Sequence, residues 1–343
     1  MSAVANFLVV LFVEVFIFGS AHATSTSAPP AWQKCVELKG LASPDKELEC
    51  YRIAAEARQE AARQTSILTS RPNGLINEWH PENALLSVYK LNYVLVYSKN
   101  SSANDAPTSP NPQNQVPSSY PLDRRDLKFQ FSIKHDLGDL GKYGSLWFAY
   151  TQRSFWQLYD ATNSRPFREN NYEPELIYSI NPQELLPGFV FNPTILNIGL
   201  VHQSNGQSNP RSRSWNRIYL SPGIEHDYGN GRKVTLLVRF WQRVKEPAAT
   251  DDNPDITDYA GYGDLELRYA LGGKWEATAI ASARAFELNL SAPWESIRLL
   301  TMAAPGEHNT NIHIQYFSGY GESLIDYNHK HTSWGVGISF PFE

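Results

Sequence analysis

The sequence has few of the features that mark several common classes of protein. Its 343 residues include only two cysteines and two methionines, and 35 acidic residues outnumber 30 basic ones, for a net charge of −5. This balance argues against a nucleic-acid-binding protein, which normally carries a basic face. After the N-terminus no apolar run approaches the roughly 20 residues of a membrane-spanning helix. A polytopic helical membrane protein is therefore excluded.

The composition is instead typical of β structure. The chain has 9 Trp, 18 Tyr and 16 Phe, together with 21 Gly and 22 Pro. Aromatic residues favour strands, while Gly and Pro interrupt them at turns. The mean hydropathy of −0.41 still allows a transmembrane β-barrel, because barrel strands carry apolar residues at only every second position.

The N-terminus has the pattern of an export signal. An apolar run over residues 7–18, interrupted by Glu14, leads into the small-x-small sequence Ala21-His22-Ala23. The run is too short to span a bilayer and is typical of a cleaved signal peptide. We therefore predict a signal peptide over residues 1–23, and a mature chain that begins in the periplasm.

Residues 24–74 differ in character from the remainder of the chain and are predicted to form a small periplasmic extension. Ser43 and Pro44 precede an acidic first turn, which predicts a helix over residues 44–64. Cys35 and Cys50 are the only cysteines. In an exported chain such a pair suggests a disulfide, with two buried thiols as the alternative.

From about residue 84 onwards, apolar and polar residues alternate with a period of two. Phe129, Phe131 and Ile133 share one face of such a segment, and Val336 and Ile338 share one face near the C-terminus. Periodicity alone fits either a soluble β-sandwich or an outer-membrane barrel. The export signal, the strand lengths near ten residues and the aromatic residues at strand ends favour the barrel. The predicted fold is all-β, a twelve-stranded antiparallel transmembrane β-barrel over residues 75–343.

The expected strands span residues 84–97, 126–135, 145–158, 175–181, 194–204, 213–222, 233–244, 258–270, 274–283, 285–292, 311–318 and 332–342. Their even number suits a single-chain barrel with both termini in the periplasm. The Ser-, Asn- and Pro-rich segment over residues 98–120 would then be a long extracellular loop, and its composition predicts disorder. Residues 271–273 would form a periplasmic turn.

One predicted hairpin carries residues with catalytic chemistry. His202 and Ser204 are two residues apart, so in a strand both side chains point from the same face. A symmetric hairpin centred on Asn209 and Pro210 sets Asn216 directly opposite His202, on that same face. This strand pair thus gathers the nucleophile, base and orienting group of a serine hydrolase. The alternative is that the three residues simply end strands in a polar loop.

The face that carries these residues is the apolar one. Ile198 and Leu200 precede His202 on its side of the strand, and Ile218 follows Asn216. In a barrel this stripe meets lipid, where polar groups are costly unless they serve a function. Strand parity places the hairpin at the extracellular end. The sequence therefore predicts a lipid-facing site at the extracellular leaflet.

Several stretches of the chain resemble outer-membrane phospholipase A, a calcium-dependent bacterial enzyme family. They are residues 150–154 (YTQRS), 167–174 (FRENNYEP), 202–219 (HQSNGQSNPRSRSWNRIY), 250–257 (TDDNPDIT) and 316–328 (YFSGYGESLIDYN). The similarity covers about residues 75–343 in the same order and leaves residues 24–74 unexplained.

The resemblance implies a calcium-dependent enzyme that hydrolyses the sn-1 and sn-2 acyl esters of glycerophospholipids and lysophospholipids in the outer membrane. It implies a twelve-stranded barrel that is active as a homodimer. Ser204 would be the nucleophile, His202 the general base and Asn216 the group that orients His202.

The resemblance also implies where calcium and the second protomer would bind. Calcium would be held by the Gln207 carbonyl and the Ser212 hydroxyl, with Ser164 of the partner chain completing the shell. Asp252 matches a carboxylate linked to a second calcium position in the monomer. Gln152 matches a polar group buried between protomers.

Two positions depart from the family pattern, which often has a carboxylate where this chain has Asn209 and an arginine where it has Gln207. Losing a nearby acid could weaken calcium binding. Two other functions stay open. One is a catalytically silent structural or adhesive barrel. The other is a passive porin. Charged inward residues such as Arg239, Glu266 and Arg268 argue against it, because they suggest mutual pairing inside a filled barrel rather than a wide pore.

Overall fold

The computed structural model describes residues 46, 48–53, 74–80, 86–117, 121–185, 193–272, 275–293 and 310–340. The chain divides into two compact units, residues 1–67 and 68–343. In the first unit, residues 46 and 48–53 are helical, within the helix predicted over residues 44–64. The predicted signal peptide and Cys35 lie outside the described residues, so the signal peptide and the disulfide with Cys50 stay predictions.

The second unit is almost entirely β structure. Its strands are β1 (Leu86–Val88), β2 (Asn92–Asn100), β3 (Arg125–Asp139), β4 (Gly144–Trp156), β5 (Phe167–Ile180), β6 (Ile195–Ser204), β7 (Ser214–Gly229), β8 (Arg232–Val244), β9 (Gly263–Gly272), β10 (Trp275–Ser282), β11 (Ala285–Pro293), β12 (Asn311–Tyr320) and β13 (Lys330–Phe340). The short helical elements are α4 (Leu75–Trp79), η1 (Pro112–Asn114), α5 (Pro182–Leu185) and α6 (Ile256–Ala260). None of the described helices is long and apolar enough to cross a membrane.

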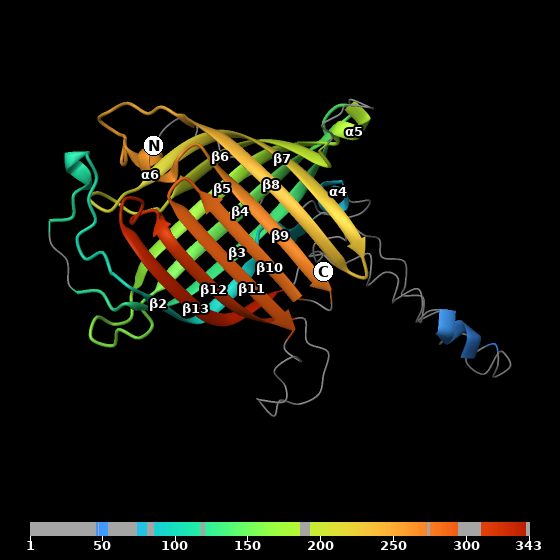
Figure 1. The fold of residues 1–343 in the computed structure, drawn as a ribbon, viewed down its shortest axis with the longest axis horizontal. Coiled ribbons are helices and arrows are strands. Elements are labelled where there is room, and N and C mark those ends of the chain that lie inside the picture. Colours follow the sequence, from blue (N-terminus) through green and yellow to red (C-terminus); the bar gives the residue numbers. More distant parts are fainter. Residues whose placement is uncertain are drawn as a thin grey trace. The chain divides into compact units, whose positions relative to one another are not determined.

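The strands close into a tilted barrel, which Figure 1 shows from the side. Each strand pairs antiparallel with its neighbour, and β3 pairs with both β2 and β4, which completes the circle. β1 and β2 lie along the same edge of β3, with Val88 opposite Ile133 and Tyr93 opposite Gln130. They therefore form one interrupted strand, and the barrel has the twelve strands that the sequence predicted.

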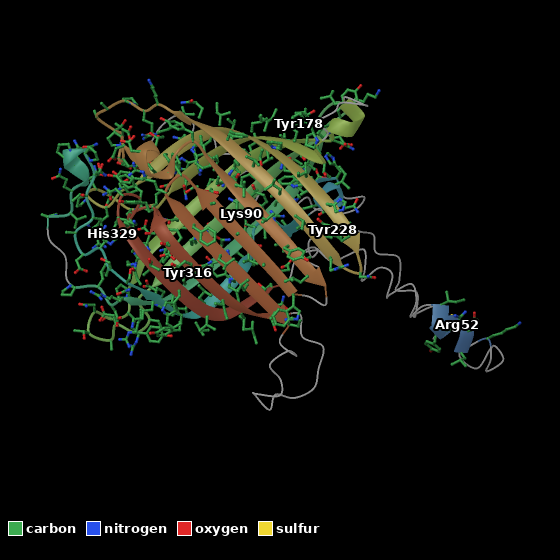
Figure 2. The ribbon with its side chains drawn as sticks, in the orientation of Figure 1. Arg52, Lys90, Tyr178, Tyr228, Tyr316 and His329 are labelled. Carbon is green, nitrogen blue, oxygen red and sulfur yellow. The ribbon has the colours of Figure 1, made fainter. Side chains whose placement is uncertain are left out.

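The two faces of the strands follow the alternation of the sequence. Ile198, Leu200 and Ile218 point outward and are 42%, 45% and 48% exposed. Figure 2 shows side chains such as Tyr316, which is 42% exposed, on the outer surface. The inward face is polar and largely buried. The apolar stripes thus form the outside of the barrel, as a lipid-facing surface requires.

Paired charges and the helix α4 lie inside the barrel. Arg239 pairs with Asp264 at 2.6 Å, and Arg268 contacts both Glu266 and, at 3.2 Å, Glu78 of α4. Trp79 of α4 is 3% exposed and packs edge-on against interior aromatic rings. These contacts confirm the predicted pairing of inward charges and argue against a wide pore.

Several local predictions were wrong. The strand expected over residues 175–181 begins eight residues earlier, at Phe167. The strand expected over residues 258–270 begins only at Gly263, because α6 occupies residues 256–260 and ends at Gly261 with a left-handed φ of 73°. The segment over residues 98–120 is not disordered where it is described, up to residue 117. Asn114 is fully buried there and Asn111 donates a hydrogen bond to the Asp251 carbonyl. The side-chain amides of this segment bind other loops and hold it in place. Its composition alone does not predict these contacts.

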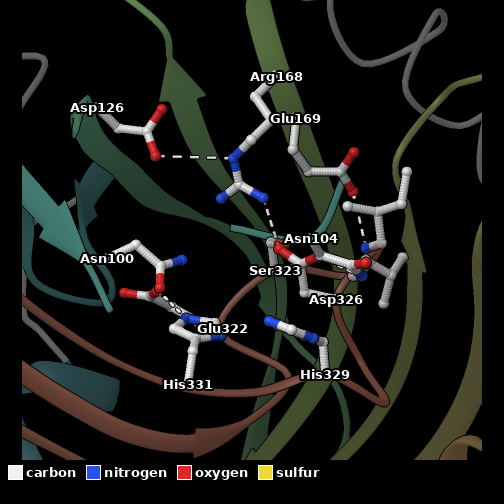
Figure 3. A network of polar contacts seen from close by, with 12 residues as sticks. Asn100, Asn104, Asp126, Arg168, Glu169, Glu322, Ser323, Asp326, His329 and His331 are labelled. Atoms are coloured by element: carbon white, nitrogen blue, oxygen red, sulfur yellow. Dashed lines mark hydrogen bonds and ion pairs between the residues drawn. The ribbon is translucent and has the colours of Figure 1, made fainter. Parts of the chain in front are cut away.

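The connections over residues 101–124, 157–166, 205–213, 245–262 and 321–329 all lie at one end of the barrel, called here the loop end. A buried ion network lies beneath them (Figure 3). Arg168 pairs with Asp326 and, at 3.6 Å, with Asp126, while Glu322 pairs with Lys128 at 2.8 Å. Burial alone would raise the pKa of Asp326, but the charge of Arg168 holds it below its usual range. These ion pairs anchor the loops to the end of the barrel.

Candidate active site

The hairpin formed by β6 and β7 has the register that a symmetric turn predicted. His202 lies directly opposite Asn216, and Ser204 lies opposite Ser214. The intervening loop, residues 205–213, contains Asn209 and Pro210 at its centre. Because opposed residues in an antiparallel pair share a face, the two strands bring the three predicted catalytic side chains to one face at the loop end.

His202 and Asn216 are hydrogen-bonded to each other. The Nδ1 atom of His202 lies 2.8 Å from Oδ1 of Asn216, and Asn216 is only 5% exposed. The amide oxygen can only accept, so Nδ1 carries the proton in this contact and Nε2 remains free to act as a base. This geometry matches the pairing of a base with its orienting group.

Ser204 follows His202 on the same outward face. Its hydroxyl accepts a hydrogen bond from the Gly206 N–H at 3.1 Å. Within the described residues no hydrogen bond joins Ser204 to His202, which is common for a nucleophile and its base before substrate binds. The apolar stripe of Ile198 and Leu200 leads directly to this pair. A lipid acyl chain can therefore lie along the barrel wall and reach the hydroxyl.

Glu246 is a site residue that the sequence reasoning missed. Its Oε1 atom accepts a hydrogen bond of 2.7 Å from Nδ2 of Asn216. Burial raises the pKa of Glu246, although the hydrogen bond from Asn216 opposes the shift. Val244, at the end of β8, lies opposite Asn216. The period-two run through Phe240 and Val244 to Glu246 could have identified the residue.

Two of the predicted calcium ligands lie together beside this hairpin. The Ser212 hydroxyl donates a 2.7 Å hydrogen bond to Asp252 Oδ2. Asn114, which was not predicted, reaches into the same cluster. Its Nδ2 atom lies 3.1 Å from Asp252 Oδ1, 3.2 Å from Asn209 Oδ1 and 2.9 Å from the Ser212 carbonyl. Four residues from three connections thus form one oxygen-rich cluster, which we call the calcium cluster.

The chemistry of the calcium cluster fits a calcium ion. Ca²⁺ prefers carboxylate, carbonyl, amide and hydroxyl oxygens, and the cluster offers all four kinds. Among the described residues, the buried Oδ1 atom of Asn114 has no hydrogen-bond partner, so it is a further oxygen available to a cation. In the described part of the chain, no three His, Cys, Asp or Glu side chains gather as a metal site. A site here would therefore depend on neutral oxygens and Asp252.

The other two predicted calcium ligands make no hydrogen bond to this cluster among the described residues. The Gln207 side chain donates a 3.0 Å hydrogen bond to Glu169 Oε2, so only its backbone carbonyl could serve the predicted role. Ser164 lies in the exposed connection after β4, with a left-handed φ of 61°. No hydrogen bond joins it to Ser212 or Asp252 among the residues that the structure describes.

The chain matches a known protein family over most of its length. The model of the family described as Phospholipase A1 matches residues 75–340. A Neisseria meningitidis relative, provisionally named phospholipase A1, is 39% identical over 253 residues, which span 72% of this chain and 63% of that protein. The aligned region is thus less than two thirds of that relative's length.

Two solved structures are also similar to the chain. An outer membrane phospholipase dimer of Salmonella typhi with bound calcium is 33% identical, with a TM-score of 0.59 over 77% of this chain and 94% of that one. An active-site mutant of Escherichia coli outer membrane phospholipase A, in which alanine replaces an asparagine, is 33% identical. Its TM-score is 0.59 over 77% of this chain and 95% of that one.

Proposed function

This chain belongs to the phospholipase A1 family of bacterial outer-membrane β-barrels, and on that premise we propose that it is a calcium-dependent phospholipase. Its substrates are glycerophospholipids and lysophospholipids, cleaved at the sn-1 and sn-2 acyl esters. The observation that carries the proposal is the 2.8 Å hydrogen bond between His202 and Asn216, with Ser204 on the same lipid-facing surface. The asparagine named in the E. coli active-site mutant supports a catalytic asparagine here.

Each of the three residues has a distinct part in the proposed reaction. The Nε2 atom of His202 removes the proton of Ser204 as its oxygen attacks the ester carbonyl. Asn216 holds the imidazole in the tautomer and orientation that this step needs. His202 then returns the proton to the departing glyceryl oxygen, and a water molecule repeats the sequence to release the fatty acid.

The calcium cluster combines the loop of this hairpin with the connections over residues 101–124 and 245–262. Ser212, Asp252 and the Gln207 carbonyl, with Asn114 beside them, would hold the ion. A bound calcium ion would polarise the ester carbonyl and stabilise the negative charge that develops on its oxygen. The calcium named in the S. typhi structure supports this assignment.

The active form is proposed to be a homodimer with its sites at the extracellular leaflet. The residues around His202 and Ser204 are apolar and exposed, so a single barrel offers only one wall to an acyl chain. A second barrel against this face would supply the other wall and bring Ser164 to its partner's calcium cluster. The dimeric state of the S. typhi relative supports this arrangement.

Fatty-acid release from mixed micelles, measured with calcium and with chelator, tests the proposed function. We expect calcium-dependent release by the purified chain and none by Ser204→Ala. The variant should still form a folded, heat-modifiable barrel, since one hydroxyl at a strand end contributes little packing.

Ser208→Ala is the matched control, because Ser208 is an exposed serine in the same loop. It should retain the activity of the parent chain. No release by the parent chain would favour the catalytically silent barrel, and near-normal release by Ser204→Ala would exclude that residue as the nucleophile.

A further inference from the structure

Asn216 has hydrogen-bond partners on both sides, and the two partners differ in kind. Its Oδ1 atom meets Nδ1 of His202 at 2.8 Å, and its Nδ2 atom meets Oε1 of Glu246 at 2.7 Å. The side chains form a continuous line from carboxylate to amide to imidazole. The carboxylate belongs to the connection after β8, whereas the other two residues belong to the hairpin of β6 and β7.

An amide side chain can bind a histidine in two ways, and only one of them suits catalysis. With its oxygen towards His202, the amide accepts a proton from Nδ1 and leaves Nε2 free. If the amide turns over, its NH₂ group donates to Nδ1, and the proton of a neutral ring then resides on Nε2. A histidine in that state cannot accept the proton of Ser204, so the orientation of the amide matters to the reaction.

Glu246 removes this ambiguity. An ionised carboxylate only accepts hydrogen bonds, so it binds the NH₂ group of Asn216 and rejects its oxygen. A hydrogen bond from a neutral donor to a carboxylate is also stronger than one between two neutral groups. The 2.7 Å contact with Glu246 therefore turns the amide oxygen towards His202.

The surroundings of Glu246 leave its carboxylate available for this role. The guanidinium of Arg243, whose positive charge acts on Glu246, is engaged by Asp251 and by the Pro254 carbonyl. Asp251 and Asp252 are the other charged groups that act on Glu246, and both repel its charge. Within the described residues Glu246 forms no salt bridge, and Asn216 is its hydrogen-bond partner.

We propose that Glu246 is a positioning residue of this site, whose carboxylate orients the Asn216 amide and through it selects the Nδ1-protonated tautomer of His202. The proposal rests on the proposed function, since it assigns the histidine as the base. It predicts that the effect of Glu246 on the reaction passes entirely through Asn216.

Kinetics of the full-length chain in calcium-containing mixed micelles test the proposal. We expect Glu246→Ala to lower kcat about tenfold, which corresponds to about 1.4 kcal/mol, with KM unchanged. Lys245→Ala alters the neighbouring exposed residue and should match the parent. In a chain that already carries Asn216→Ala, adding Glu246→Ala should change kcat less than about twofold, because the residue through which it acts is gone.

A rescue experiment separates orientation from a merely structural role. Asn216→Asp places a second carboxylate against Glu246, and this repulsion should lower kcat. Adding Glu246→Gln should restore much of the loss, because the glutamine amide can donate to the introduced carboxylate. Heat-modifiability of each variant on gels checks that the barrel is folded.

These measurements distinguish failure of the Glu246 positioning role from failure of the proposed phospholipase function. An active parent whose Glu246→Ala variant has normal kcat, or multiplicative effects of Glu246→Ala and Asn216→Ala, would overturn the positioning role and leave the phospholipase assignment intact. Failure of Glu246→Gln to improve Asn216→Asp would also overturn it. A parent chain that releases no fatty acid would overturn the proposed function and this inference together.

Discussion

Asn216 forms hydrogen bonds to both the His202 imidazole and the Glu246 carboxylate. An aspartate at the same position could not do both in this chain. The amide carries one donor and one acceptor group, and these match the Glu246 carboxylate on one side and the His202 N–H on the other. A carboxylate would meet His202 well but would lie against Glu246 as a like charge. The carboxylate of Glu246 therefore explains why asparagine, rather than aspartate, suits the position that orients His202.

The ionisation of Glu246 should be visible in the pH dependence of the reaction. Burial raises the pKa of Glu246 above its ordinary value of 4.5. As the pH falls through this raised pKa, the protonated carboxyl can donate to the amide oxygen of Asn216 and compete with His202. We expect log kcat to fall on the acid side with a slope steeper than about one, because both His202 and Glu246 take up protons there.

The matched variant is Glu246→Gln, which does not titrate. The kcat of this variant should be lower on the pH plateau. On the acid side, its log kcat should fall with a slope of about one and begin to fall at a lower pH than in the parent. The measurement is the pH profile of kcat at saturating calcium, so that calcium occupancy does not limit the rate. Identical limbs in the two proteins would show that Glu246 does not titrate in the active enzyme.

The connection that contains η1 links the other two connections of the calcium cluster. Asn114 ends η1 and contacts Asn209, Ser212 and Asp252 through one amide. The two N–H groups of this amide are shared among the three acceptors, so this single side chain links three connections. Among the described residues, the Oδ1 atom of the same side chain has no hydrogen-bond partner.

Asn114→Ala should loosen the calcium cluster without altering the catalytic residues. We expect the calcium concentration for half-maximal activity to rise several-fold, about 1 kcal/mol of binding free energy, while kcat at saturating calcium stays near that of the parent. Residues 101–117 should also become more sensitive to proteinase K. Gln115→Ala, which alters an exposed side chain of the same segment, is the control. An unchanged calcium titration would contradict a role for Asn114 in the cluster.

The strands of the barrel could be predicted wherever they depend on the alternation of apolar and polar residues along the chain. The period of two placed β6 and β7, and the symmetric hairpin placed His202 opposite Asn216. Contacts between distant segments were not predictable in this way. The order of residues 101–117 depends on Asn114 reaching connections about a hundred residues away. The period-two run through Phe240 and Val244 does point to Glu246, but not to its contact with Asn216 on the neighbouring strand β7. A single sequence carries no direct signal for such contacts.

At the scale of the whole molecule, the barrel reverses the arrangement of a soluble protein. Its interior holds paired charges and its exterior is apolar, so the site formed by His202 and Ser204 opens towards lipid rather than towards a cavity. Gln152 shares the outward face of β4 and is hydrogen-bonded to Tyr150 and Ser154 at 3.0 Å each. A polar residue on a lipid-facing wall suits a surface that a second barrel covers.

Mixed dimers test whether two protomers share each site. In the proposed dimer Ser204 acts in its own chain, whereas Ser164 completes the calcium site of the partner. Ser204→Ala and Ser164→Ala should each be inactive alone. In a mixed dimer, the chain with the Ser164 substitution keeps its nucleophile and receives an intact Ser164 from the other chain, so one of its two sites works.

Random pairing of equal amounts makes half of the dimers mixed, and the mixture should recover roughly a quarter of the parent activity, provided that calcium and protomer concentration suffice for dimerisation. The recovered activity should vanish on dilution into excess detergent and return on concentration, which a monomeric enzyme would not show. Full calcium-dependent activity of Ser164→Ala alone would contradict the shared site, because the chain would then build a complete site from its own Ser212, Asp252 and neighbouring oxygens.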